Sequence, residues 1–232
     1  MYLNSLIYLC RCKLKRRNKM KSIKLLALSV IAIFAVDASA QLTKNTEEWT
    51  RVELSFNAQK MKAKDDNNST DGQKTKGAAF AFMKGINLTT KLPLFLDLGA
   101  RLTWNHAKES WTGGDDKWTF MNIAVPVNAA YKLSFASSPV TIVPFFGPNF
   151  KFNFLARYKW DGNDGHDVKQ NLLKEDEGDA KIFQFGLNLG VGVNIRKFYV
   201  GYHFQPDLSS FQKNGDYKVK TLNNYVSVGL NF

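Results

Sequence analysis

His203 is the residue best placed for nucleophilic chemistry, because Ser209 and Ser210 follow it closely in the chain. A histidine beside a serine can activate the hydroxyl as a nucleophile, as in some lipid-modifying enzymes. However, the nearest position on the same face of the segment 198–205 is Gln205 and not a serine. We therefore predict no catalytic residues and no enzymatic activity, and keep a lipid-modifying enzyme as an alternative.

An acidic, glycine-rich connection is the best candidate for a metal site. It places Asp161, Asp164 and Asp167 around His166, and closely spaced carboxylate oxygens are ligands that Ca²⁺ prefers. The twelve-position pattern of a calcium-binding hand is incomplete, and no helical periodicity flanks it. The chain also lacks the common phosphate-binding, dinucleotide-binding and zinc-binding motifs. We predict no metal and no cofactor.

The beginning of the chain has the features of a targeting segment. A basic stretch at 20–24 precedes an apolar run at 25–36. Ala38 and Ala40 then supply the small residues that signal peptidase recognises. We predict cleavage before Gln41. A membrane helix is the alternative interpretation of the apolar run.

Removal of the leader and signal peptide, residues 1–40, changes the charge and the cysteine content. The leader holds eight of the 32 Lys and Arg and one of the 20 Asp and Glu, so the net charge falls from +12 to +5. This moderate charge gives little support for nucleic-acid binding, and we predict none. Cys10 and Cys12 also lie in the leader, which excludes disulfides and thiol chemistry from the mature chain. Within the leader, we interpret 1–19 as a mis-assigned start, with Met20 as the true one.

Alternation of apolar and polar residues dominates the rest of the chain. At 183–195 every odd position is apolar, which is the period of a β-strand, whose successive side chains point to opposite faces. Eight such segments occur, at 48–60, 78–90, 94–105, 118–132, 140–154, 181–195, 198–205 and 222–232. Most reach the roughly 9–11 residues with which a tilted strand crosses a bilayer.

The connections between these segments alternate in length. Long polar connections lie at 61–77, 106–117, 155–180 and 206–221, and short turns lie at 91–93, 134–139 and 196–197. Outer-membrane barrels combine short periplasmic turns with longer outer loops in this way. We predict an all-β fold over residues 41–232: an eight-stranded antiparallel up-and-down transmembrane β-barrel with long extracellular loops.

Charged residues on the polar face help to decide whether that face points into the barrel or outward. Periodicity alone does not distinguish a membrane barrel from a soluble one such as a lipocalin, whose apolar face points inward. Arg51, Glu53, Asp97 and Arg101 lie on the polar face. Because buried charges need partners, we predict an internal salt-bridge cluster, with solvated charges on a soluble barrel as the alternative. Lys84 falls on the predicted lipid face in mid-strand, and we expect a bulge or a shifted register there.

The last segment ends in a stripe of apolar residues. Val226, Val228, Leu230 and Phe232 occupy alternate positions. The stripe resembles the terminal signal by which outer-membrane proteins are recognised for barrel assembly. We therefore predict handling by the barrel-assembly machinery, contact of these side chains with outer-membrane lipid, and localisation in the cell outer membrane.

Two motifs in the middle of the chain resemble those of a known family. Residues 123–132 read Ile-Ala-Val-Pro-Val-Asn-Ala-Ala-Tyr-Lys, and residues 143–150 read Val-Pro-Phe-Phe-Gly-Pro-Asn-Phe. They are similar to paired strand motifs of the small outer-membrane β-barrels of Bacteroidetes, the PorT-like barrels. The resemblance implies a barrel in a Gram-negative envelope and leaves the activity open.

These observations favour a non-enzymatic outer-membrane barrel with a structural, envelope-interaction or surface-binding role. The long connection at 155–180 would then carry partner recognition. The alternative is a transport role, as a narrow channel or an accessory to protein secretion. The interior of an eight-stranded barrel is only just filled by side chains, which argues against a water-filled pore. Beyond lipid and the assembly machinery, the expected partners are envelope or secretion proteins.

Overall fold

The structure is a computed structural model that describes residues 42–64, 69–136, 138–163, 165–174, 178–212 and 218–232. Its strands are β1 (Leu42–Thr43), β2 (Trp49–Lys64), β3 (Ser69–Asn87), β4 (Leu94–Trp111), β5 (Gly114–Tyr131), β6 (Leu133–Phe135), β7 (Val140–Gly162), β8 (Asp167–Asn171), β9 (Phe183–Ile195), β10 (Phe198–Pro206) and β11 (Lys218–Asn231). The predicted leader, with Ala38 and Ala40, lies outside the described residues. No helix in the described part is long and apolar enough to cross a membrane.

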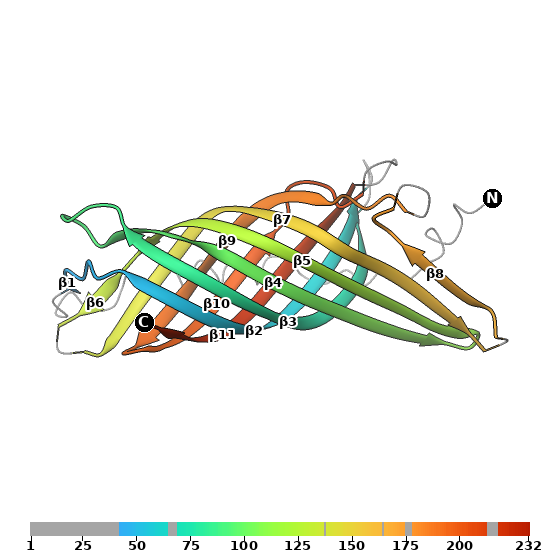
Figure 1. Cartoon of the computed structure of the whole chain (residues 1–232), viewed down its shortest axis with the longest axis horizontal. Helices are drawn as coiled ribbons and strands as arrows, with labels where there is room; N and C mark the ends of the chain where they lie inside the picture. The colour runs from blue at the N-terminus through green and yellow to red at the C-terminus, as the bar shows by residue number, and fades with distance from the viewer. Residues whose placement is uncertain (1–41, 65–68, 137, 164, 175–177, 213–217) are drawn as a thin grey trace.

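Eight of these strands close into an antiparallel barrel (Figure 1). In chain order, β2, β3, β4, β5, β7, β9, β10 and β11 each pair with the next, and β11 pairs with β2. Closure of the ring leaves no free strand edge in the wall. This arrangement confirms the predicted eight-stranded up-and-down barrel.

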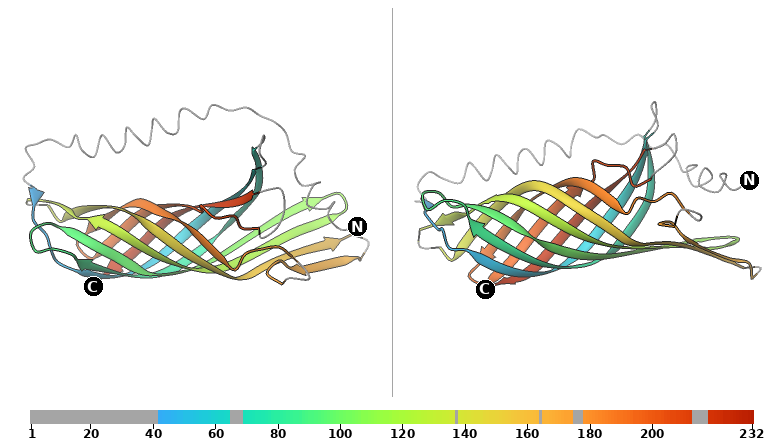
Figure 2. Two further views of the ribbon diagram at one scale, coloured as in Figure 1. Left: turned by 90° about the horizontal axis from the view of Figure 1, so that it is seen from above. Right: turned by 45° about the horizontal axis from the view of Figure 1, so that its top comes forward.

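The two ends of the barrel differ (Figures 1 and 2). At the end that we call the turn end, short connections at 88–93 and 196–197 join neighbouring strands, β6 pairs with β1, and the chain ends on Phe232. At the opposite end, which we call the hairpin end, the β2–β3 and β4–β5 pairs and β7 with β8 run past the wall of the barrel.

Much of the sequence predicted as long loops is therefore strand. The β4–β5 pair closes in a tight turn at Thr112 and Gly113, inside the loop predicted at 106–117. Cross-strand ion pairs stabilise these extensions, as between Lys108 and Asp115 at 2.8 Å. One face of this hairpin is polar, and the other interrupts its tryptophans with Glu109 opposite Asp116. The regular alternation that marks a half-buried strand is therefore not present there.

The apolar face of the wall points outward. Leu54 is 62% exposed and Val228 is 57% exposed, whereas their chain neighbours Glu53 and Ser227 are fully buried in the lumen. A soluble barrel would show the reverse arrangement, so the alternative of a lipocalin-like barrel is wrong. The outward side chains form the surface that hydrocarbon covers in a membrane barrel.

The C-terminal stripe lies on this outward face. Val226, Val228, Leu230 and Phe232 are between 43% and 72% exposed. Phe232 also exchanges two backbone hydrogen bonds with Thr50, at 2.8 and 3.1 Å, and so extends the pairing of β11 with β2. The position is that expected of a lipid-facing stripe, and its role in barrel assembly stays a prediction.

Lys84 sits near the rim and not in mid-strand. It pairs with Thr50 on one side and Leu98 on the other, in the regular register of β3. Its ammonium nitrogen lies 3.7 Å from Glu48 Oε2, and both side chains are more than 40% exposed. The expectation of a bulge or a shifted register at this lysine is therefore wrong, because the turn end accommodates it with an acidic partner.

Candidate functional site

The four charged residues singled out in the sequence meet inside the barrel. Arg51 Nε donates to Glu53 Oε1 at 2.6 Å, and Arg101 Nη2 donates to Glu53 Oε2 at 2.9 Å. Arg51 Nη2 also donates to Asp97 Oδ2 at 3.3 Å. No side chain of the four is more than 2% exposed. The small Ala81 of β3 lies between Glu53 and Arg101 in the strand register and leaves room for the guanidinium group to cross.

His203 belongs to this cluster and not to a nucleophile site. Its Nε2 lies 3.3 Å from Glu53 Oε2, and its ring nitrogens lie 3.2 Å from Arg101 Nη2. Ser209 and Ser210 make hydrogen bonds with backbone groups of residues in β9 and β11. The described structure therefore does not bring the histidine and the two serines together as a catalytic pair.

Two buried tyrosines complete the cluster, and sequence reasoning missed both. The Arg51 guanidinium carbon lies 4.0 Å from the ring centroid of Tyr199, and that of Arg101 lies 4.7 Å from the ring centroid of Tyr225. Aromatic faces attract cations, most strongly where water is excluded. The alternation places both tyrosines on the inward face, but it does not reveal which strands bring them to the height of the arginines.

The middle of the lumen is filled by polar side chains that hydrogen-bond to one another. Asn105 Nδ2 donates to Gln59 Oε1 at 2.7 Å, and Asn57 Nδ2 donates to Asn105 Oδ1 at 2.9 Å. A second buried ion pair joins Lys151 and Asp207. These bonds give partners to many polar groups that are costly to bury alone. Several buried atoms have no hydrogen-bond partner among the described residues, including Asn57 Oδ1 and the Nε and Nη1 atoms of Arg101.

An apolar cluster fills the lumen at each end. The turn-end plug consists of Trp49, Phe95, Ala130, Val143 and Phe145. The hairpin-end plug consists of Met61, Phe120, Ala156, Ala180 and Phe211. No member of either plug is more than 9% exposed. Between the plugs even Glu53, Arg101 and Asn188 are inaccessible to solvent. The interior is a packed core and not a water-filled passage.

The acidic connection does not assemble into a metal site. Asp161 lies in the part of β7 beyond the wall, where its carboxylate pairs with Lys117 Nζ at 2.5 Å and with Lys159. Hydrogen bonds from these two lysines hold the pKa of the Asp161 carboxyl below its ordinary value. Asp164 lies outside the described residues. Within the described ranges, no group of three or more His, Cys, Asp or Glu could hold a metal ion.

Comparisons with known proteins bear on the family of the chain. Residues 24–213 match the model of a family described as Outer membrane protein beta-barrel domain. Among solved structures, Ail, the attachment invasion locus protein of Yersinia pestis, is 10% identical, with a TM-score of 0.44 over 78% of this chain and 98% of that chain. Neisserial surface protein A (NspA) is 17% identical, with a TM-score of 0.42 over 78% of this chain and 97% of that chain.

A comparison with curated proteins found no match. The two structural similarities are too weak to support an argument about function, whereas the family match covers most of the chain. The PorT-like resemblance within Bacteroidetes stays a prediction.

Proposed function

The chain belongs to the outer membrane protein beta-barrel domain family, and from this premise we propose that it is a non-enzymatic outer-membrane barrel with a surface-binding role. The barrel would anchor the protein in the outer membrane and hold the sheet at its hairpin end for contact with envelope or secretion proteins. Export through a signal peptide cleaved after Ala40 and insertion by the barrel-assembly machinery are part of the same proposal.

The observation that carries the proposal is the closed lumen. A channel or a catalytic pocket inside the barrel would need side chains that solvent or substrate can reach. Glu53, Arg101 and His203 are instead at most 1% exposed, and an apolar plug lies at each end. These facts favour the surface of the protein over its interior as the functional part.

The hairpin end offers a surface suited to binding. Here β4, β5, β7 and β8 form a sheet that extends past the wall (Figure 2). One face of this sheet carries Trp111, Trp118, Tyr158 and Trp160, as the strand register requires. Trp111 is 53% exposed. Trp118 and Tyr158 are half-buried, with ring centroids 4.5 Å apart, and Trp118 packs against the hairpin-end plug. Tryptophan and tyrosine are among the residues enriched at the centres of binding interfaces.

We predict no stable conductance from the folded barrel in planar lipid bilayers. The polar lumen between the two plugs has no room for a column of water, as expected for an eight-stranded barrel. The measurement is single-channel recording on protein whose folded state is verified by its heat-modifiable migration on gels. Reproducible channels of one size would contradict the proposal and favour the transport alternative.

We also predict that the hairpin end faces the cell exterior. The mature chain has no cysteine. Labelling of a single introduced cysteine therefore shows on which side of the membrane that residue lies. Gly113→Cys, where an added side chain meets no atom within 4 Å, is expected to react with a membrane-impermeant maleimide on intact cells. Lys197→Cys, in the β9–β10 turn, should react only after permeabilisation. The parent without substitutions is the control, and the reverse labelling pattern would contradict this orientation.

A further inference from the structure

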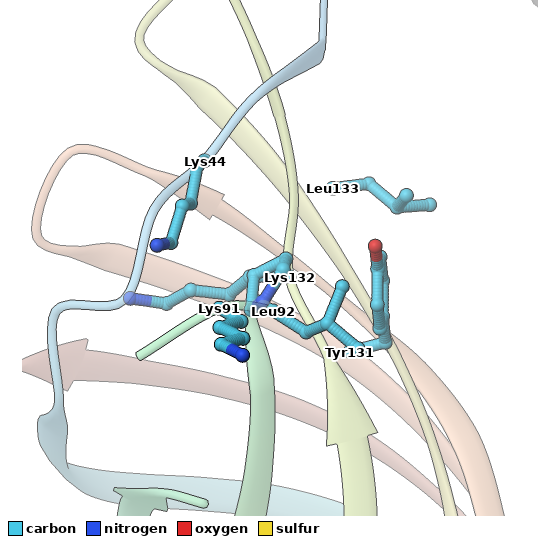
Figure 3. A pocket seen from close by; sticks show the side chains of 7 residues that line it. Lys44, Lys91, Leu92, Tyr131, Lys132 and Leu133 are labelled. Atoms are coloured by element: carbon cyan, nitrogen blue, oxygen red, sulfur yellow. The ribbon is translucent and has the colours of Figure 1, made fainter. Parts of the chain in front are cut away.

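A small basic pocket lies at the turn end, away from the lumen and from the hairpin-end sheet. It has a volume of about 210 Å³ and is lined by Lys44, Lys91, Leu92, Pro93, Tyr131, Lys132 and Leu133. Figure 3 shows the long Lys132 side chain reaching toward the segment that carries Lys44, with Tyr131 and Leu133 on the opposite side. The pocket thus joins cationic and apolar groups at one point of the barrel rim.

Lys132 builds the pocket by fixing the segment that precedes β2. It is only 7% exposed, and its Nζ donates to the Glu47 carbonyl oxygen at 2.5 Å. The same nitrogen lies 4.9 Å from the ring centroid of Trp49, a member of the turn-end plug. Burial lowers the pKa of the Lys132 ammonium, and the charge of Glu47 opposes that shift. These contacts hold residues 44–48 against the rim and place Lys44 over the pocket.

Lys44 and Lys91 supply the charge that a ligand would meet. Both side chains are exposed, and neither forms an ion pair with a described residue. No carboxylate lines the pocket. Two free ammonium groups beside a third, buried one favour an anion.

The remaining wall of the pocket is apolar and continues onto the lipid face. Leu92 is 52% exposed and Tyr131 is 38% exposed. Aromatic and basic residues at a barrel rim lie at the level of lipid headgroups. The volume is smaller than the roughly 300–1,000 Å³ of pockets that enclose whole drug-sized ligands. It suits a headgroup whose acyl chains lie outside, along the barrel wall.

We propose that this turn-end pocket binds the phosphate of an anionic phospholipid headgroup, with Lys44 and Lys91 as its direct contacts. Lys132 is a positioning residue that holds the Lys44 segment in place. Leu92 and Tyr131 contact the glycerol and the first carbons of the acyl chains.

The test is native mass spectrometry of the full-length mature barrel, titrated with phosphatidylglycerol in detergent. The wild type is expected to retain one lipid, and Lys44→Gln combined with Lys91→Gln is expected to weaken retention by about tenfold or more. Lys76→Gln combined with Lys169→Gln removes the same charge from exposed lysines nearer the hairpin end and should leave retention unchanged. Both substituted pairs are exposed, and gel migration verifies that each variant folds.

Equal retention by the wild type and the Lys44/Lys91 variant would overturn the proposal. An equal loss in the Lys76/Lys169 variant would also overturn it, because it would show a general effect of net charge. Displacement of the lipid by millimolar inorganic phosphate would identify free phosphate as the ligand and overturn the assignment to a phospholipid. None of these results depends on conductance or on labelling at the hairpin end.

Discussion

Replacing Glu53 by leucine is expected to lower the free energy of unfolding by about 3–5 kcal/mol, the range for removing one partner of a buried ion pair. Glu53 accepts hydrogen bonds from Arg51 at 2.6 Å and from Arg101 at 2.9 Å, and none of the three side chains is more than 1% exposed. Without the carboxylate, the buried Arg101 guanidinium would lose its acidic partner, and only Arg51 would keep one, Asp97. The measurement is urea unfolding in lipid vesicles, followed by tryptophan fluorescence.

Glu48→Leu is the matched control for this substitution. It removes an equal charge from the exposed ion pair with Lys84 at the turn end, and exposed pairs contribute only about 0–1 kcal/mol. Combining Glu53→Leu with Arg101→Met should recover part of the loss, because the second change removes one of the unpaired charges. A Glu53 variant as stable as the Glu48 variant would show that water reaches the cluster, against the closed lumen.

The charge cluster was predictable from the sequence because it depends only on strand parity and on the need of buried charges for partners. Arg51, Glu53, Asp97 and Arg101 lie at inward parity on two segments, and buried charges of opposite sign must meet. His203 also has inward parity, but no comparable rule predicts that it joins the charge cluster. Through β11 its register partner on β2 is Asn57, whereas its ring contacts Glu53. Contacts across the lumen depend on the tilt and stagger of the strands, which alternation within single segments does not specify.

The extent of the strands at the hairpin end was not predictable for a different reason. Alternation marks a strand only where one face is apolar and the other polar. In the β4–β5 extension, one face pairs Lys108 with Lys117, as expected of a polar face. The opposite face interrupts its tryptophans with Glu109 paired to Asp116, so it gives no continuous apolar signal. Ion pairs across the strands stabilise a sheet in a region where the hydrophobic pattern predicts a loop. The binding surface proposed for this end was therefore visible only once the strands were paired.

Replacing Leu54 by arginine is expected to lower the free energy of unfolding in vesicles by about 2–4 kcal/mol, the cost of a cation near the bilayer midplane of a barrel. Leu54 is 62% exposed and lies midway along the wall portion of β2. In the register it pairs with Val228 and Phe80, whose side chains also point outward. An arginine there would be surrounded by hydrocarbon. Urea titration of the refolded protein, as for the Glu53 variant, gives the change.

Val168→Arg is the matched control for the Leu54 substitution, because Val168 is 41% exposed in β8, beyond the wall. Water surrounds that position, so the expected change is within about 0.5 kcal/mol, as for most surface substitutions. The comparison separates lipid from water as the medium around each side chain, since both changes add the same charge to an exposed apolar residue. If Leu54→Arg were as harmless as Val168→Arg, the outward face of the wall would not be in contact with hydrocarbon. A large loss at Leu54 alone requires that the bilayer covers the wall and stops short of β8.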